Sequence, residues 1–354
     1  MRSTPGFLPY LQAQLSEMSV ERLNRINDPL GFSLSTLVSQ VSQPQDHTVY
    51  NLYEPESGVK KRAEISHSTT ELGAQSLASG EVAYCILSGD MGTRQDETKA
   101  LFRVPIVDTT LLAIKLLQAH GLKHVWVMTN SMNHEDIESH LCELSKGQEV
   151  KLFQQFESVR LTPDNQLHLE NGEPSFYPCG HGDVVSSLQK SGLLKSFLES
   201  GGKHIMVVNV NNVLAAPDPA LIGQHIVDNS PVTCEVVDKL KTDNSGGVLC
   251  NHMGFDQIVE QFRFYTQPDP EMFKWLSTNT YIFKADLDFS TIRWSWHRIK
   301  KEFSGKLVVQ HERLLQDLTS VFSTQYVGAP REERYMPVKS NEDLKDASRI
   351  FRKL

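Results

Sequence analysis

A glycine-rich turn that follows an apolar run near residue 85 has the composition of a phosphate-binding loop. The run Val82–Leu87 leads directly into the turn Ser88-Gly89-Asp90-Met91-Gly92-Thr93-Arg94. Glycines behind a buried strand allow backbone N–H groups to approach a phosphate closely, and Lys99 follows within reach. Because two glycines after a strand form a plain tight turn about as often, this segment alone leaves both interpretations open.

Three later segments carry groups suited to a phosphorylated, hydroxyl-rich molecule. A histidine lies between two glycines in Phe176-Tyr177-Pro178-Cys179-Gly180-His181-Gly182-Asp183. Three asparagines, Asn209, Asn211 and Asn212, follow an apolar run, and Lys339 follows Pro337-Val338. Each segment also has an ordinary interpretation: a loop with a structural histidine, a polar turn that closes a strand, and a solvated surface lysine. None of the three identifies a site by itself.

The elements that must position these residues follow from an alternation of apolar runs and amphipathic segments. Strands are predicted at 82–87, 124–130 and 203–210, and helices at 109–121, 133–147, 192–202 and 218–229. Asn133 is suited to the N-cap of its helix. This order predicts an α/β fold with a doubly wound, mainly parallel sheet. Short strand-like segments at 232–240, 246–252 and 256–265 predict an antiparallel extension, and 313–323 is predicted to be helical.

Segments distributed along the chain resemble, in order, motifs of the UDP-glucose/UDP-sugar pyrophosphorylase family of nucleotidyltransferases. The first three, GEVAYCILSGDMGTRQDETKALF, VWVMTNSMNHEDIESHL and KLFQQFESVRL, resemble the family's LxGGxGT loop with its PK, its LMNSFNT and its FNQSxxPR. The most specific, FYPCGHGD, is similar to WYPPGHGD. Next, EVVDKLKTDNSGGVLC and FKWLSTNTYIF resemble EVTxKTxADxKGG and FKxFNTNN, and QHERLLQDL and PREERYMPVK resemble QLETAxGxAI and PRxRFxPVK. The shared order over roughly residues 72–345 argues against chance agreement.

The resemblance implies a Rossmann-like, GT-A-like nucleotidyltransferase. Such an enzyme joins a sugar or sugar-like 1-phosphate to a nucleoside triphosphate and releases a nucleotide sugar and pyrophosphate. UTP and glucose 1-phosphate are the family default, and a cyclitol phosphate of a specialised biosynthetic pathway is the divergent alternative. Because both reactants are anions, the site must offset their repulsion and stabilise charge on the transferred phosphate.

The resemblance also assigns roles to individual residues. The catalytic groups near the reacting phosphates would be Lys99, His181 and Lys339, a lysine being suited to act as a mobile point charge. The nucleotide would contact Leu87, Ser88, Gly89, Asp90, Gly92, Thr93, Arg94, Gln155, Pro178 and Gly180. The sugar phosphate would contact His181, Asn209, Glu260, Asn279 and Lys339.

The chain departs from the family pattern at the metal. The family carries a Mg²⁺-binding aspartate after the buried strand, whereas this chain has Asn211 there. An amide oxygen is a weaker ligand than a carboxylate for a hard divalent cation. Asp90 replaces a glycine of the signature loop, where it would repel a triphosphate or, with a cation between them, partly replace the lost aspartate. The resemblance implies Mg²⁺ as the cofactor, whereas Asn211 argues against its binding; Asn211 and Asp90 are the candidate ligands.

Other departures concern single residues and the extent of the chain. Ser245 replaces the lysine of KGG, and Cys179 replaces the second proline of PPGHGD. We expect an N-terminal accessory helix and loop region at 1–70, the catalytic domain at 71–340 and a C-terminal tail at 341–354. No counterpart is expected of the C-terminal β-helical domain into which glucose-specific eukaryotic members continue.

Two other classes of function remain open on the sequence. A binding protein that kept the ligand contacts but lost metal-assisted turnover would explain Asn211 and Asp90. A glycosyltransferase would use a similar nucleotide-binding domain and usually carries a DxD motif after a buried strand; the one DxD of this chain, Asp286-Leu287-Asp288, stands outside the segments that resemble nucleotide-binding motifs.

Bulk composition narrows the class of protein. The 354 residues carry a formal net charge of -8 without an acidic or basic tail, so nucleic acid is not an expected partner. Five widely spaced cysteines without a CxxC pair argue against a disulfide framework or a zinc site. Since charges interrupt every apolar run near the N-terminus, we expect neither a signal peptide nor a membrane span, and a cytoplasmic location. The oligomeric state is left open.

Overall fold

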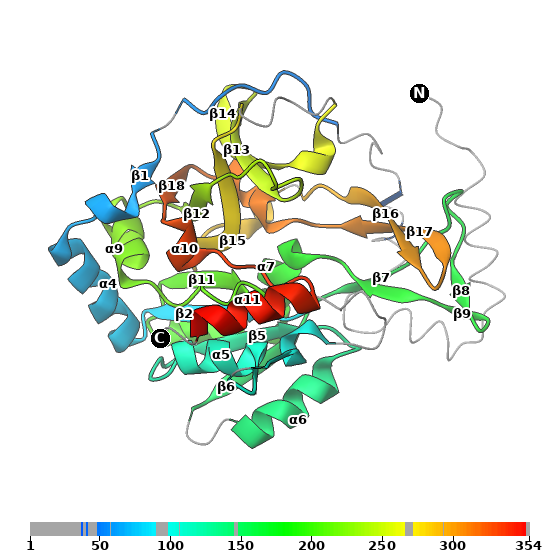
Figure 1. Cartoon of the computed structure of the whole chain (residues 1–354), viewed down its shortest axis with the longest axis horizontal. Coiled ribbons are helices and arrows are strands. Elements are labelled where there is room, and N and C mark those ends of the chain that lie inside the picture. Colours follow the sequence, from blue (N-terminus) through cyan, green and yellow to red (C-terminus); the bar gives the residue numbers. More distant parts are fainter. Residues whose placement is uncertain are drawn as a thin grey trace.

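A mixed sheet lies at the centre of the computed structural model (Figure 1). The structure describes residues 37, 40–41, 48–56, 58–89, 98–105, 107–144, 148–265, 272–292 and 294–351. In this part of the chain ten strands join one sheet, eight of them in the order β1-β18-β12-β15-β11-β2-β5-β6, with β13 and β14 branching from β15. Their bounds are β1 Lys60–Lys61, β2 Val82–Leu87, β5 Val125–Thr129, β6 Val150–Gln154, β11 His204–Asn209, β12 Val232–Asp238, β13 Gly247–His252, β14 Phe255–Glu260, β15 Trp275–Lys284 and β18 Thr324–Gly328.

Four strands of the sheet, β11, β2, β5 and β6, pair in parallel, and a second parallel set, β1, β18 and β12, lies beyond the antiparallel β15. Every residue of β2 and of β5 is buried, as expected for strands covered on both faces. Side chains alternate between two cores: Tyr84 and Ile86 enter one, and Ala83 and Cys85 enter the other. The predicted doubly wound, mainly parallel sheet is confirmed.

Helices cover both faces of this sheet. The core of Tyr84 and Ile86 receives side chains from α4 (His67–Ser79), α5 (Leu111–Gln118), α6 (His134–Leu144), α9 (Pro219–Val227) and α11 (Asn341–Phe351). The opposite core receives those of α7 (Val184–Ser191) and α8 (Leu193–Glu199). Residues 341–354, expected as a C-terminal tail, thus include α11, whose Leu344 and Ala347 are buried in the first core.

Local sequence explains where several helices begin and how closely two of them pack. The hydroxyls of Ser66 and Thr110 accept backbone N–H groups at the starts of α4 and α5, and the Asp218 carboxylate does so at α9. Helices α4 and α9 touch through glycines. A Cβ atom on Gly73 would lie 1.9 Å from the Pro219 carbonyl oxygen, so only glycine allows this approach.

The antiparallel part is arranged differently from the prediction. Strands β13 and β14 form the expected hairpin, at the top of Figure 1. Strand β12, however, lies in the main sheet between the antiparallel β15 and the parallel β18. The pairing of β12 with β15 is interrupted by a bulge around Glu235.

Shorter elements lie outside the main sheet. A hairpin of β16 (His297–Phe303) and β17 (Lys306–Glu312) projects to the right in Figure 1, near the smaller hairpin of β8 (Leu169–Glu170) and β9 (Glu173–Pro174). The remaining short pairs are β3 (Arg103–Val104) with β4 (Thr109–Thr110), and β7 (Glu157–Val159) with β10 (Phe176–Pro178). The other helical turns are η1 Arg62–Glu64, η2 Lys99–Leu101, η3 His181–Asp183, η4 Gln261–Arg263, η5 Phe289–Thr291, η6 Leu315–Ser320 and α10 Arg331–Arg334.

The segment predicted to be helical at 313–323 forms the 3₁₀ helix η6. Its contacts repeat every three residues: Leu315 and Leu318 are buried in the core, while Gln316 and Thr319 bond β14. A period of three is that of a 3₁₀ helix, which explains the tighter winding.

None of the helices in the described part of the chain combines the length and the apolar character that a membrane-spanning helix requires.

Candidate active site

The carboxyl ends of the parallel strands meet at one edge of the sheet. Leu87, the last residue of β2, pairs in register with Asn209, the last residue of β11. On the other side of β2, strand β5 ends at Thr129 and β6 ends just before Gln155. This edge is where doubly wound sheets bind ligands, because the loops that leave it surround a crevice.

Two buried asparagines hold the residues that follow β2. The Asn130 amide donates to the Gly89 carbonyl at 2.8 Å, and the Asn133 amide donates to the Ser88 carbonyl at 2.8 Å. Asn130 also donates its backbone N–H to the Asn133 side-chain oxygen at 2.9 Å. Asn133 directly precedes α6, as expected of an N-cap, but its side chain is bound to Ser88 and Asn130. These bonds fix the backbone of Ser88 and Gly89, the first two residues of the glycine-rich turn.

Gln155 and Gly89 are in close contact. A Cβ atom on Gly89 would lie 1.9 Å from Gln155 Nε2, and that nitrogen is 3.5 Å from the Gly89 carbonyl oxygen. Gln155 is 3% exposed. A glycine at position 89 therefore allows the buried amide of Gln155 to face the end of β2.

The Gly180–Asp183 turn runs against the backbone that follows β17. Gly180 has φ 92° and ψ 167°, a conformation open only to glycine, and an added Cβ would lie 2.5 Å from the Arg313 carbonyl oxygen. At Gly182 the corresponding atom would lie 2.7 Å from Leu314 N. Both glycines are required by this close approach of two backbones.

A backbone N–H group holds the His181 imidazole in one tautomer. The Leu315 N–H donates to His181 Nδ1 at 3.0 Å. Because Nδ1 acts as an acceptor, the neutral ring carries its proton on Nε2. The imidazole thus offers an Nε2–H donor, the group that a phosphate oxygen requires.

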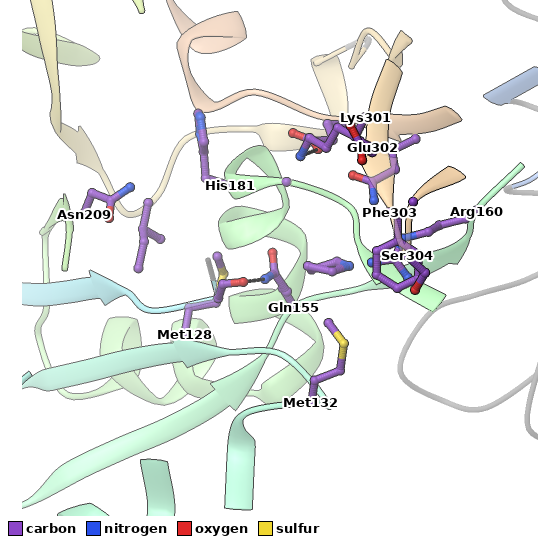
Figure 2. A pocket seen from close by; sticks show the side chains of 17 residues that line it. Met128, Met132, Gln155, Arg160, His181, Asn209, Lys301, Glu302, Phe303 and Ser304 are labelled. Atoms are coloured by element: carbon purple, nitrogen blue, oxygen red, sulfur yellow. Dashed lines mark hydrogen bonds and ion pairs between the residues drawn. The ribbon is translucent and has the colours of Figure 1, made fainter. Parts of the chain in front are cut away.

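The larger of two cavities at this edge has a volume of about 810 Å³ (Figure 2). Asn209 and His181 lie at one end, Gln155 lies near the middle, and Arg160, Phe303 and Ser304 lie at the other end. The full lining is Leu87, Gly89, Met128, Met132, Gln155, Arg160, Pro178, Gly180, His181, Asn209, Lys301, Glu302, Phe303, Ser304, Gly305, Gln310 and Glu312.

The tip of the β16–β17 hairpin forms the far wall of the larger cavity. The Arg160 guanidinium lies 3.6 Å from the centre of the Phe303 ring, and Ser304 donates to Glu170 of β8 at 2.9 Å. Arg160 also donates to Ser175 at 2.9 Å. Burial lowers the pKa of Arg160 to about 10, so the side chain remains a cation near neutral pH. The hairpin tip is therefore attached to the β8–β9 side of the cavity.

The smaller cavity, of about 150 Å³, begins where the larger one ends. Both are lined by His181 and Asn209. The smaller one is otherwise lined by Asn211, Asn212, Gly246, Gly247, Ile258, Glu260, Ser277, Thr278, Asn279, Tyr281, Gln316, Tyr335, Pro337 and Lys339. Hydroxyl, amide and carboxyl groups predominate, which suits a ligand with several hydroxyls.

The bulge in β15 places Asn279 in the smaller cavity. Asn279 has φ 60°, a left-handed conformation that is uncommon in a strand, and its N–H donates to Ser277 Oγ at 3.1 Å. Next to it, Thr278 donates to the buried Glu235 carboxylate at 2.9 Å, and Glu235 pairs with Arg334 at 2.7 Å. Bulges redirect side chains beside functional sites, and here the buried ion pair stabilises the bulge.

Glu260 provides a carboxyl group in the smaller cavity. Burial raises the pKa of Glu260 to about 7, although the hydrogen bond from Gln316 and the charge of Lys339 lower it. The Gln316 amide donates to Glu260 Oε1 at 2.7 Å. Glu260 can therefore accept or donate a hydrogen bond near neutral pH.

Lys339 reaches this site because its segment is bonded to the turn after β11. Val338 N donates to the Asn211 carbonyl at 2.8 Å, and Met336 N donates to the Asn212 side chain at 3.0 Å. Asn212 in turn donates to the Arg334 carbonyl at 3.0 Å. Asn211 and Lys339, which are far apart in the sequence, thus line one cavity.

The cavities gather most of the residues expected from the sequence. From the nucleotide group, Leu87, Gly89, Gln155, Pro178 and Gly180 line the larger cavity. From the sugar-phosphate group, His181, Asn209, Glu260, Asn279 and Lys339 line the smaller one. Ser88 is fully buried, and Lys99, half-buried at the start of η2, lines neither cavity. Asp90, Gly92, Thr93 and Arg94 lie outside the described residues.

Several residues of the site were not anticipated from the sequence. These are Asn130 and Asn133, Arg160, and the hairpin tip with Phe303 and Ser304. The hairpin has a sequence signal, because Ser304-Gly305 stands between two strand-like runs. In the structure both residues have positive φ, as two-residue hairpin turns require.

The chain is similar in sequence to one protein family over most of its length. The family model of UTP–glucose-1-phosphate uridylyltransferase matches residues 39–351. The uridylyltransferase of that name from Hordeum vulgare is 28% identical over 286 residues, which cover 73% of this chain and 59% of the relative. A second from Dictyostelium discoideum is 28% identical over 305 residues, covering 78% and 59%. The chain thus spans about three fifths of the length of these curated relatives.

Solved structures share the fold. A point mutant of UDP-glucose pyrophosphorylase from Leishmania major, in complex with UDP-glucose, has a TM-score of 0.75 and 18% identity, with 97% of this chain and 79% of that chain covered. The uridine diphosphate N-acetylglucosamine pyrophosphorylase of Trypanosoma brucei has a TM-score of 0.75 and 17% identity, covering 98% and 82%. At these identities the likeness concerns the fold alone.

Proposed function

The chain belongs to the UTP–glucose-1-phosphate uridylyltransferase family, and we propose that it transfers a nucleotidyl group from a nucleoside triphosphate to a sugar or sugar-like 1-phosphate. The observation that carries this proposal is that the two cavities meet at His181 and Asn209. A nucleotide in the larger cavity and a sugar phosphate in the smaller one would bring their phosphates together at that junction.

In this proposal the nucleoside binds between the end of β2 and the Gly180 turn. The backbones of Gly89 and Gly180 line the larger cavity and would flank the base, and the Gln155 amide can hydrogen bond to a base edge. Asn130 and Asn133 hold the preceding backbone rigid, so the base meets a preformed pocket. Rigid pockets increase affinity because little ordering is required on binding.

The sugar would bind among the amide and carboxyl groups of the smaller cavity. Asn209 and Asn279 can donate hydrogen bonds to ring hydroxyls and accept hydrogen bonds from them, and Glu260 can accept a hydrogen bond from a hydroxyl. A hydroxyl that is missing would leave such buried groups unpaired, which makes polar pockets selective.

The reaction requires no covalent intermediate on the protein. A phosphate oxygen of the sugar 1-phosphate forms a bond to the α-phosphorus, and the bond from that phosphorus to the bridging oxygen breaks. Pyrophosphate leaves with the electron pair. His181 Nε2–H and the Lys339 ammonium would hold the two anions together and stabilise charge on the transferred phosphate.

The described residues do not fit a resident Mg²⁺ held by carboxylates. The polar side chains around Asn211 include the amides of Asn209 and Asn211 and the ammonium of Lys339. Glu260 is a single carboxyl and is already bonded to Gln316. Across the described chain no group of three His, Cys, Asp or Glu side chains could hold a metal. We therefore assign no step of the reaction to a bound metal.

The first substrates to test are UTP and glucose 1-phosphate, the pair in the family name. The polar lining of the smaller cavity is also compatible with other polyhydroxylated phosphates, including cyclitol phosphates. A second candidate function, a binding protein without turnover, is favoured by one observation, the amide of Asn211 at the family's metal-ligand position.

Pyrophosphate release tests the proposal. Each nucleoside triphosphate is combined with glucose 1-phosphate and with related sugar and cyclitol phosphates, with Mg²⁺ in the buffer. We expect release from one pair, and about a 100-fold loss of kcat in Lys339→Met, since removing one such contact costs about 10²–10³. Lys345→Met on the exposed face of α11 is the matched control.

Two outcomes would decide against nucleotidyl transfer. Silence of the wild-type protein with every pair, followed by activity of Asn211→Asp, would favour the binding protein. Release of a nucleoside diphosphate from a ready-made nucleotide sugar, with no pyrophosphate from any triphosphate pair, would indicate a glycosyltransferase.

A further inference from the structure

Arg313 is bound to the Cys179–Asp183 turn through both its side chain and its backbone. Its Nη1 lies 3.2 Å from Asp183 Oδ1, and its guanidinium lies 4.1 Å from the centre of the buried Trp296 ring. Its backbone N–H donates to the Cys179 carbonyl at 2.7 Å, and its carbonyl accepts Gly182 N–H at 3.0 Å. The residue therefore connects the end of β17 with the turn that carries His181.

The same short segment determines the state of His181. Leu315, two residues after Arg313, donates the N–H that occupies His181 Nδ1. Gly180 and Gly182 pack directly against the backbone of 313–314, with no space for a Cβ. A displacement of Arg313 would consequently move Leu315 N relative to the imidazole.

Asp183 is the buried partner of Arg313. It is fully buried, its Oδ1 accepts a hydrogen bond from Arg313 at 3.2 Å, and it precedes α7 without a capping bond to it. Burial raises the pKa of Asp183 to about 7, while Arg313 is the cation that opposes this shift. Removing Arg313 alone would leave a buried acid without its counter-charge.

We propose that Arg313 is a positioning residue for His181. Its hydrogen bond to Asp183 Oδ1 and its stacking on Trp296 hold the 313–315 backbone where Leu315 keeps His181 as the Nε2–H tautomer facing both cavities. The importance of that tautomer for turnover rests on the proposed function, whereas the tautomer itself does not.

The test combines a spectroscopic and a kinetic readout on the full chain. With ¹⁵N-labelled histidine, NMR distinguishes Nε2–H from Nδ1–H for His181. We expect wild type to show Nε2–H, and Arg313→Met to show a mixture of tautomers with kcat reduced about 10-fold or more. Its KM for the nucleotide should change far less than kcat. Arg298→Met on β16, where the side chain contacts the Pro163 carbonyl and lines neither cavity, should match wild type in both readouts.

The outcomes separate this inference from the proposed function. A folded Arg313→Met protein that keeps the wild-type tautomer would overturn the inference, whatever its activity. If no variant turns over any substrate pair, the function fails while the NMR result still decides the role of Arg313. If Arg313→Met does not fold, the double variant Asp183→Asn, Arg313→Met removes both charges and takes its place. Failure of that variant to fold would also contradict a role limited to positioning.

Discussion

Replacing Asp183 by asparagine should stabilise the protein at neutral and alkaline pH. Asp183 is 0% exposed, and burial raises the pKa of its carboxyl from 3.8 to about 7 despite the nearby Arg313. An asparagine has nearly the same shape as the protonated acid and can still accept a hydrogen bond from Arg313, but it never carries the buried charge. The substitution thus removes a cost of ionisation without opening a cavity.

The magnitude follows from the size of the pKa shift. Between pH 3.8 and about 7 the unfolded chain loses the Asp183 proton while the folded chain keeps it. The unfolded state then binds fewer protons, so this group lowers the free energy of unfolding as pH rises, by about 1.4 kcal/mol per pH unit. Over roughly three units the effect is about 4 kcal/mol, and it levels off above pH 7. Asp183→Asn should equal wild type near pH 4 and exceed it by about 4 kcal/mol at pH 8.

Urea unfolding of both proteins between pH 4 and 8 measures this difference. Other titrating groups cancel because they are common to the two chains. The exposed Asp286→Asn is the control and should change the free energy of unfolding by less than about 0.5 kcal/mol at either end. If Asp183→Asn is less stable than wild type at pH 8, the ion pair with Arg313 outweighs burial and our reasoning is wrong.

Three further predictions concern packing, the nucleotide and acid stability. Gly73→Ala, although favourable for a helix, should destabilise by about 1–3 kcal/mol in thermal unfolding because its Cβ meets a carbonyl oxygen of α9, whereas Gly58→Ala, with open space around it, should not. Gly89→Ala should displace Gln155 and raise KM for the nucleotide about 10-fold, leaving KM for the sugar phosphate near wild type. Burial lowers the pKa of His225 to about 3, so this residue should lower the free energy of unfolding by about 2 kcal/mol between pH 6.5 and 5. The difference between wild type and His225→Asn in urea unfolding separates this contribution from those of Asp183 and His204.

The central strands and their helices could be predicted because their sequences carry local signals. The runs that became β2, β5 and β11 are continuous and apolar, as strands covered on both faces require. The winding of η6 was not predictable, since Leu315 and Leu318 fit a helix of either kind. Its 3₁₀ form depends on bonds from Gln316 and Thr319 to β14, which no local pattern reveals.

The site could be predicted only where its residues stand in recognisable motifs. His181 and Lys339 were identified in this way, and the structure brings both to one cavity. The orientation of Asn279 was not predictable because it depends on a bulge that forms against Glu235 of another strand. The role of Arg313 was also hidden, since its contact with Asp183 joins segments 130 residues apart.

The most direct test of nucleotidyl transfer is ³¹P NMR of the full chain with Mg²⁺, a nucleoside triphosphate and a sugar or cyclitol 1-phosphate, starting with UTP and glucose 1-phosphate. We expect the signals of one such pair to give way to pyrophosphate and the two coupled phosphorus signals of a nucleotide sugar. Omitting the sugar phosphate should abolish both products. Spectra that stay unchanged for every pair would contradict the proposed function.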